Sequence, residues 1–296
     1  MGKVTTASVP VGEEGIRKKS TNTIFRRFLK NKLSVFGLII LAIMVLLAIF
    51  APVLATHDYQ AIDPINANQP PSMEHILGTD AYGRDMFSRM LYGTRYSLAI
   101  GICSQALALV SGVILGSLAG YFSGLTDTII LRFTDIFQAI PSTLLAIVIS
   151  QALGSGFAQT VIALAVGGIP IAIRMLRATM LTVRVQEYVE AAQAIDCTNV
   201  RIIFKHVLPN SLAPMIITTS LGIGRMIMTS AGLSYLGLGI QEPAAEWGAI
   251  LSLGKSMIRY HPYQVIVPGI AIALIVLAFN LIGDGLRDAL DPKLRS

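Results

Sequence analysis

Residues 187–210 read EYVEAAQAIDCTNVRIIFKHVLPN, a polar, mixed-charge island between two long apolar runs. Glu187 and Glu190 are one helical turn apart, so both carboxylates can lie on one side of a helix. Pro209 suits the first turn of a following helix, where a missing N–H costs no hydrogen bond. The stretch therefore predicts a short helix, a turn and the start of a second helix. It is too polar to cross a bilayer, and we interpret it as a cytoplasmic docking surface; an ordinary loop helix is the alternative.

The composition around this island indicates a membrane protein. Hydrophobic residues make up 53% of the chain and charged residues 14%, whereas soluble domains usually carry about 25% charge. The formal net charge is +6, but eight of the 23 Lys and Arg residues lie within the first 32 positions. That clustering suits a cytoplasmic flank beside anionic lipid. No RNP, zinc-finger or helix-turn-helix pattern supports nucleic-acid binding, so no nucleic-acid partner is expected.

The apolar runs predict an all-α membrane protein with six transmembrane helices. A bilayer core needs about 20 apolar residues, and the runs lie at 33–55, at 96–126, within 136–173 as two helices divided by the turn at 153–156, from after Pro209 to residue 231, and at roughly 265–282. Basic residues precede the first run, which places both termini in the cytoplasm. Five further basic residues fall on the outer side and weaken this rule: Arg84, Arg89, Arg95, Lys255 and Arg259.

The same pattern divides the chain into three parts. Residues 1–32 form a cytoplasmic tail and basic flank, residues 33–92 the first transmembrane helix and an outer loop, and residues 93–296 a core transmembrane domain with a docking helix at about 187–205. Between the fifth and sixth helices we expect a re-entrant or surface-lying segment.

Several other functions lack the residues they need. The stretch from Gly248 to Ser256 resembles a phosphate-binding P-loop, but it has five residues between its glycines where four are required. No HExxH or Ser-His-Asp arrangement supports an intramembrane enzyme. Cys103 and Cys197 are placed at different membrane levels, so we expect no disulfide.

The polar island resembles the EAA loop of permease subunits from binding-protein-dependent ABC importers. Glu190, Ala191, Ala192, Leu208 and Pro209 stand at the motif's spacing. The chain departs from it twice, with Asp196 at the usual glycine position and His206 at the usual isoleucine position. Because Asp can also adopt left-handed backbone geometry, we expect the turn between the two short helices to be kept.

Three further segments resemble the C-type permeases of the dipeptide, oligopeptide and nickel importers: LGTDAYGRDMFSRMLYGTRYSL, LSYLGLGIQEPAAEWG and AFNLIGDGLRDALDPKL. The resemblance implies a type I ABC importer permease fold in a bacterial cytoplasmic membrane. It also implies a heterodimer with a B-type permease, two cytoplasmic ATPases that carry ATP and Mg²⁺, and an extracytoplasmic solute-binding protein. The implied substrate is a di- or oligopeptide, with nickel or metallophore complexes, glutathione and opines as alternatives. The chain itself is expected to bind no cofactor and to catalyse no reaction.

Candidate functional residues fall into three groups. The resemblance assigns ATPase coupling to Glu187, Glu190, Ala191, Ala192, Asp196, Leu208 and Pro209. Charges at membrane depth are costly, which makes Arg225 and Asp135 candidates for the solute pathway; pairing of Arg225 with a partner-subunit carboxylate is the alternative. On the outer side, Asp80, Arg84 and Asp85 predict either a salt-bridged turn or a cation or docking contact. A secondary transporter or channel stays open as well, and co-purifying ATPases would exclude it.

Overall fold

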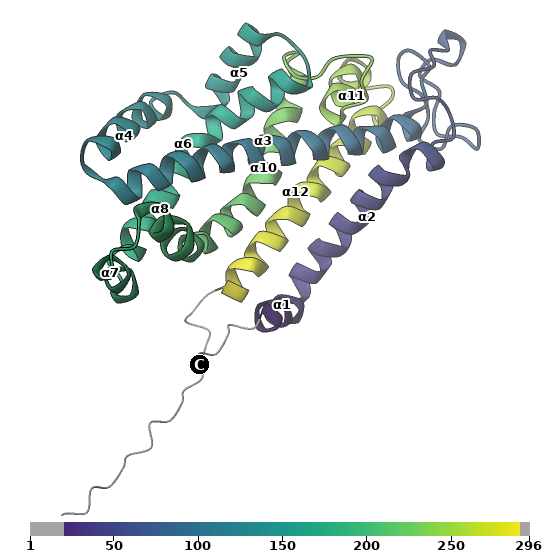
Figure 1. The fold of residues 1–296 in the computed structure, drawn as a ribbon. Helices are drawn as coiled ribbons and strands as arrows, with labels where there is room; N and C mark the ends of the chain where they lie inside the picture. The colour runs from purple at the N-terminus through teal and green to yellow at the C-terminus, as the bar shows by residue number, and fades with distance from the viewer. Residues whose placement is uncertain (1–20, 291–296) are drawn as a thin grey trace, which may run out of the picture.

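The computed structural model describes residues 21–290, and within them every regular element is helical (Figure 1). Residues 1–20, which form most of the predicted tail and basic flank over 1–32, and the last residues, 291–296, lie outside the described residues. The all-α fold class predicted from the apolar runs is thereby confirmed for the described part.

Five helices are long and apolar enough to cross a membrane: α2 (Lys32–Leu54), α3 (Met86–Phe122), α6 (Phe157–Val183), α10 (Ala213–Tyr235) and α12 (Tyr263–Leu290). Helices α4 (Gly124–Gln138) and α5 (Ser142–Leu153) meet at a bend of 85°. If they count together as one broken span, the total is six. Shorter helices complete the chain: α1 (Thr21–Lys30), α7 (Glu187–Ala194), α8 (Asn199–Ile202), α9 (Leu208–Ser211) and α11 (Trp247–Gly254).

Two helix boundaries differ from the sequence prediction. The second crossing helix begins at Met86 rather than residue 96, because Asp85 caps it by accepting a hydrogen bond from the Ser88 amide at 2.7 Å. The expected division after residue 92 therefore falls inside α3. The uncharged run at 136–173 is also interrupted before Pro141, since proline lacks the N–H that would continue a helix. As a result Asp135 lies in the last turn of α4, not near the start of a straight crossing helix.

Helix α3 packs along α6 through Gly112, Gly116 and Gly120, which follow one another at intervals of about one turn. A Cβ atom on Gly112 would lie 2.3 Å from the Cβ of Ala172, and one on Gly120 would lie 2.8 Å from the Cβ of Met180. Small residues at this spacing let two membrane helices approach closely, which gains van der Waals contact where no water is available to drive association. Helices α2, α10 and α12 pack together beside this pair (Figure 1).

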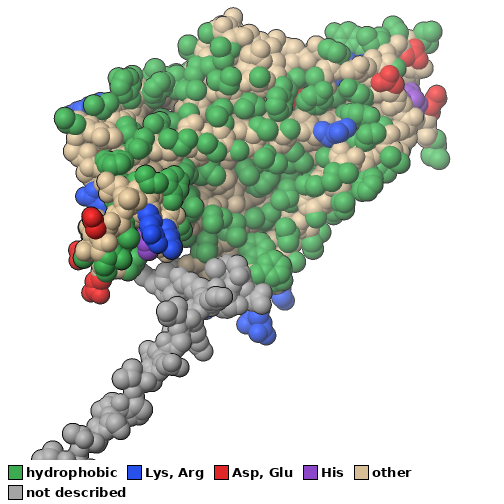
Figure 2. All heavy atoms as spheres, in the orientation of Figure 1, with side chains coloured by type: hydrophobic (Ala, Val, Ile, Leu, Met, Phe, Trp, Pro, Cys, Tyr) green, Lys and Arg blue, Asp and Glu red, His purple; other side chains and the backbone are tan. Residues whose placement is uncertain are grey.

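The two ends of the molecule are polar and the middle is apolar. Figure 2 shows hydrophobic side chains covering the middle of the visible face, while charged side chains gather toward the ends. Helix α2 presents Phe36, Ile49 and Val53 outward, as expected for side chains that meet lipid tails. The chain is a multi-pass membrane protein.

The docking stretch lies at the same end as the described parts of both terminal regions. Helices α1, α7 and α8 and the end of α12 share one end, while the 55–85 loop and α11 lie at the other (Figure 1). The Asn31 side-chain amide donates to an Asp288 carboxylate oxygen at 3.1 Å and joins the start of α2 to the end of α12 there. The predicted cytoplasmic level of 187–210 therefore agrees with the predicted level of the termini.

Candidate functional site

The coupling segment, which we define as residues 187–211, is a chain of short helices rather than a single one. It consists of α7, a turn at 195–198, α8, a π-helical turn over Ile203–Val207, and α9 with Pro209 in its first turn. Leu212 separates it from α10. The predicted helix, turn and second helix are all present.

One face of the coupling segment is fixed to the membrane helices. Val189 and Val207 are fully buried, and they pack in one cluster with Leu176 and Met180 of α6 and with Met215 of α10. Burial of side chains of this size stabilises the contact by about 1.5–3 kcal/mol each. The segment is therefore packed against the ends of α6 and α10 that it connects.

The two adjacent alanines do not share a role. Ala191 is exposed, whereas Ala192 is buried in the same cluster as Val189. Positions 189 and 192 are three residues apart and lie on the inward face of α7. Ala192 thus packs against its own chain, and only Ala191 offers a flat surface beside Glu187 and Glu190, both of which are exposed.

The turn after α7 is held in the left-handed conformation that glycine normally adopts. Asp196 has a φ of +58°. Its amide donates to the Gln193 carbonyl at 2.9 Å, and the Cys197 amide donates to the Ala192 carbonyl at 3.1 Å. This pair of bonds is a Schellman motif, which closes a helix through one left-handed residue. The expectation that Asp196 keeps the turn is confirmed.

Exposed apolar side chains on the coupling segment were not identified from the sequence. Ile195 is 77% exposed and Phe204 67%, and Tyr188 and Val200 are exposed as well. Apolar residues inside an otherwise polar island were the available signal. A separate cleft of about 370 Å³ lies beside α7, and its lining includes Glu190, Gln193, Tyr121 and Arg184.

Arginine side chains tie the end of α6 to the turn between α3 and α4. Arg184 donates to the carbonyls of Gly120 at 3.2 Å and Tyr121 at 3.1 Å, which are left free at the end of α3. Arg177 binds both carboxylate oxygens of Asp127, at 2.5 and 2.6 Å. Bidentate pairs of this kind restrict orientation as well as distance.

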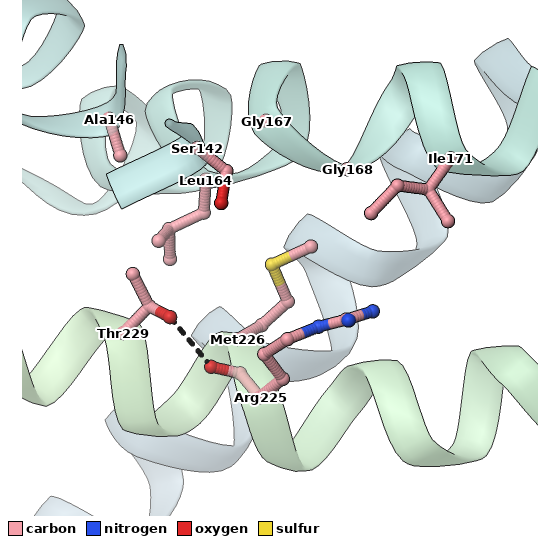
Figure 3. A pocket seen from close by; sticks show the side chains of 9 residues that line it. All are labelled: Ser142, Ala146, Leu164, Gly167, Gly168, Ile171, Arg225, Met226 and Thr229. Atoms are coloured by element: carbon pink, nitrogen blue, oxygen red, sulfur yellow. Dashed lines mark hydrogen bonds between the residues drawn. The ribbon is translucent and has the colours of Figure 1, made fainter. Parts of the chain in front are cut away.

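The pathway candidate Arg225 lines a cavity between α5, α6 and α10 (Figure 3). Gly167, Gly168 and Ile171 form part of the α6 wall, and Thr229 lies one turn from Arg225 on α10. The Arg225 side chain is exposed, and no carboxylate among residues 25–290 forms an ion pair with it. The cavity holds about 60 Å³, well below the roughly 300–1,000 Å³ of a typical ligand pocket. The cavity in this chain alone is therefore smaller than a typical ligand pocket by a factor of about five or more.

The second pathway candidate, Asp135, lies elsewhere. Its carboxylate accepts a hydrogen bond from Arg174 of α6 at 2.5 Å, and both side chains are about half exposed. It is absent from the lining of the Arg225 cavity. The structure thus pairs Asp135 with Arg174 rather than bringing the two candidates together.

On the outer side, Asp80 and Arg84 form a buried ion pair. The Arg84 Nε donates to an Asp80 oxygen at 2.7 Å, and the other Asp80 oxygen accepts the Tyr82 and Arg84 amides. Glu242, from the loop before α11, completes the cluster with contacts to Arg84 at 2.5 Å and to buried Arg89 at 2.9 Å. No local pattern in the sequence indicates Glu242, because it is more than 150 positions away from Arg84 and Arg89. Asp85 belongs to a different group, with His57 and His75.

Comparisons with known proteins agree with this arrangement. A family model described as "Binding-protein-dependent transport system inner membrane component" matches residues 112–296, which include the coupling segment and Arg225. The chain belongs to this permease family. A second model, for the N-terminal TM domain of oligopeptide transport permease C, matches residues 21–71 of the permease.

Curated relatives match the permease over nearly its whole length. It is 47% identical over 272 residues to the dipeptide transport system permease protein DppC of Alkalihalophilus pseudofirmus, covering 92% of this chain and 90% of that protein. It is 42% identical over 299 residues to the glutathione transport system permease protein GsiD of Pectobacterium atrosepticum, covering 99% and 98%. The permease is therefore a C-type transport subunit and not an enzyme.

Solved structures support the fold alone. A chain of the MetNI methionine ABC transporter in an inward-facing conformation aligns with a TM-score of 0.57 at 20% identity, over 70% of this chain and 98% of that chain. The type I permease fold implied by the EAA resemblance is thereby confirmed.

Proposed function

We propose that this permease forms one half of an ATP-driven import pathway for di- or oligopeptides in a bacterial cytoplasmic membrane. A B-type permease supplies the other half, two cytoplasmic ATPases dock on the coupling segment, and a solute-binding protein delivers the peptide from outside. ATP and Mg²⁺ are held by the ATPases. Support for the substrate class comes from the similarity to the dipeptide permease and from a 41% identity over 285 residues to the oligopeptide permease protein OppC of Bacillus subtilis.

One observation carries the proposed mechanism. The Arg225 cavity is lined by α5, α6 and α10, and α6 and α10 are the two helices that the coupling segment joins. Val189 and Val207 pack the segment against both helices. A displacement of the coupling segment by the ATPases therefore changes the spacing of α6 and α10 at the cavity. The shift requires that the ATP-bound ATPases bind one arrangement more tightly than the other.

Arg225 is then the residue that meets the carboxylate of a passing peptide. A lone guanidinium at membrane depth is costly unless it faces water or a negative charge. A charged hydrogen bond contributes about 1.5–3 kcal/mol. Reversal of the charge is thus expected to reduce peptide uptake at least about tenfold, since each 1.4 kcal/mol is a factor of ten.

The test uses the complete importer in proteoliposomes. Uptake of a labelled dipeptide is measured for Arg225→Glu and Arg225→Lys, and subunit content is measured by gel filtration. Arg132→Glu is the control, because Arg132 is exposed on α4 and is not part of the cavity lining. Reduced uptake in an intact complex supports the proposal. Loss of assembly instead shows that Arg225 pairs with the partner permease, and full uptake by Arg225→Glu rejects the pathway role.

Glutathione import is a second candidate, favoured by the similarity to the glutathione permease over almost the full length of both chains. Glutathione is also a short peptide with free carboxylates, so Arg225 serves both substrates. The ligand that co-purifies with the cognate solute-binding protein distinguishes the two.

A further inference from the structure

His57, His75 and Asp85 converge at the outer end of the molecule from three separate parts of the chain. His57 follows the end of α2, His75 lies in the outer loop, and Asp85 caps α3. The His75 Nδ1 is 2.9 Å from an Asp85 carboxylate oxygen, and the His57 Nδ1 is 3.8 Å from the same oxygen. One ligand atom from each residue lies within 4.8 Å of the others.

We propose that these three residues form a binding site for a divalent transition-metal ion of the zinc class. Two imidazole nitrogens and one carboxylate are the ligand set that zinc uses with a fourth position open to water. Imidazole suits Zn²⁺, Ni²⁺ and Cu²⁺, whereas Mg²⁺ and Ca²⁺ prefer oxygen ligands throughout. This site is independent of the peptide pathway and of the coupling segment.

The carboxylate is already oriented and kept available as a ligand. Its second oxygen accepts the Ser88 amide at 2.7 Å, which is the capping bond of α3. The Asp85 side chain is fully buried and that of His75 is 12% exposed, so both are held by their surroundings. Such outer contacts are what fix the orientation of metal ligands.

His57 is the residue that must move. In a tetrahedral site with metal–ligand distances of about 2.0–2.1 Å, ligand atoms lie roughly 3.4 Å apart. The widest pair here is at most 4.8 Å apart. The His57 side chain is 37% exposed, and its ring centroid lies 4.6 Å from that of His75. Rotation of this half-exposed ring closes the site without any change in the helices.

Metal binding would join the end of α2 to the start of α3. The His57 amide already donates to the Ser88 hydroxyl at 3.1 Å, so the two segments are in contact before any ion binds. The bound ion thus holds the outer loop against the start of α3, and water fills the fourth coordination position of the ion.

The experiment uses the assembled importer, purified without a polyhistidine tag and treated with a chelator. Zn²⁺ binding is measured by isothermal titration calorimetry for the wild type, His57→Gln and His75→Gln. His261→Gln is the matched control, because His261 also lies toward the outer end but packs near Tyr263, with ring centroids 6.0 Å apart. Melting temperatures without metal show whether each variant is folded.

One equivalent of Zn²⁺ is expected to bind to the wild type and to His261→Gln. His57→Gln and His75→Gln should each weaken binding at least about tenfold, since even outer-contact losses cost 10–100-fold in metal affinity. Addition of Mg²⁺ or Ca²⁺ in excess should leave the titration unchanged. If His75→Gln unfolds, His57→Gln decides, because its ring is half exposed. The proposal is overturned if the wild type binds no Zn²⁺, or if a folded His57→Gln variant binds it as tightly as the wild type. Asp85 would then serve only as the hydrogen-bonded cap of α3.

Discussion

The turn at Asp196 allows backbone conformation to be tested separately from charge. The Asp196 side chain is exposed, and within residues 25–290 it makes no hydrogen bond or ion pair. Its φ of +58° is left-handed. A substitution at this position therefore changes the free energy of forming the turn, and it removes no side-chain hydrogen bond or ion pair. Four variants form the series: Asp196→Gly, Asp196→Asn, Asp196→Ala and Asp196→Val.

The expected cost follows from the backbone geometry. Left-handed conformation costs an ordinary L-residue roughly 1–2 kcal/mol, and Asp, Asn and especially Gly less. Ala should therefore destabilise the turn by about 1 kcal/mol relative to Gly, and β-branched Val by about 2 kcal/mol. Differences of that size change the ratio of formed to opened turn by about 5–30-fold. If the ATPases bind only the formed turn, coupling falls in the same order.

The assay measures peptides imported per ATP hydrolysed by the complete importer in proteoliposomes. Asp196→Gly and Asp196→Asn should stay close to the wild type, Asp196→Ala should fall below them, and Asp196→Val should be lowest. Unchanged coupling in Asp196→Val would refute the proposed requirement for a formed turn. Equal losses in Asp196→Asn and Asp196→Val would show that the charge matters and the backbone does not.

Three further predictions concern other parts of the chain. Glu190→Arg should uncouple ATP hydrolysis from uptake by reversing a charge on the docking surface, whereas Glu74→Arg on the exposed outer loop should not; wild-type uptake in Glu190→Arg would remove the docking assignment. Gly112→Ala should lower the melting temperature in detergent, because overpacking costs about 1–3 kcal/mol, while Gly232→Ala, with open space around it, should not; equal melting temperatures would contradict the close α3–α6 contact. Burial raises the pKa of the Glu246 carboxyl, so its ionisation opposes folding above its ordinary pKa. The melting temperature of Glu246→Gln relative to wild type should therefore be higher at pH 8 than at pH 5, and a difference independent of pH would argue against this.

Local patterns were sufficient for much of the site. The coupling segment was recognised from Glu190, Ala191 and Pro209 at fixed spacing, and its turn was expected from the ability of Asp196 to take a left-handed conformation. Both are properties of residues close together in sequence. The burial of Ala192 could not be predicted from the motif. The motif specifies which residues are present, but it does not specify which face of α7 packs against α6.

Charged residues on the outer side were harder to interpret. Asp80, Arg84 and Asp85 are neighbours in sequence, so the sequence predicts that they form one group. The structure separates them, since Arg84 pairs with both Asp80 and Glu242 while Asp85 lies beside two histidines. Arg89, which weakened the positive-inside rule, is fully buried against Glu242 and so is not exposed to either aqueous phase.

The sequence by itself determined the membrane class, the apolar spans, the shared level of the termini and the coupling segment, and the position of the polar turn within it. Each depends on the length of an apolar run, which must match the bilayer thickness, or on the spacing of a few residues along a helix. Both are local properties of the sequence. Only the tertiary structure decided the bend between α4 and α5, the cavity beside Arg225, and the meeting of His57, His75 and Asp85. These features depend on how distant segments pack against one another, and a packing contact between residues far apart in the chain leaves no periodic trace in either segment.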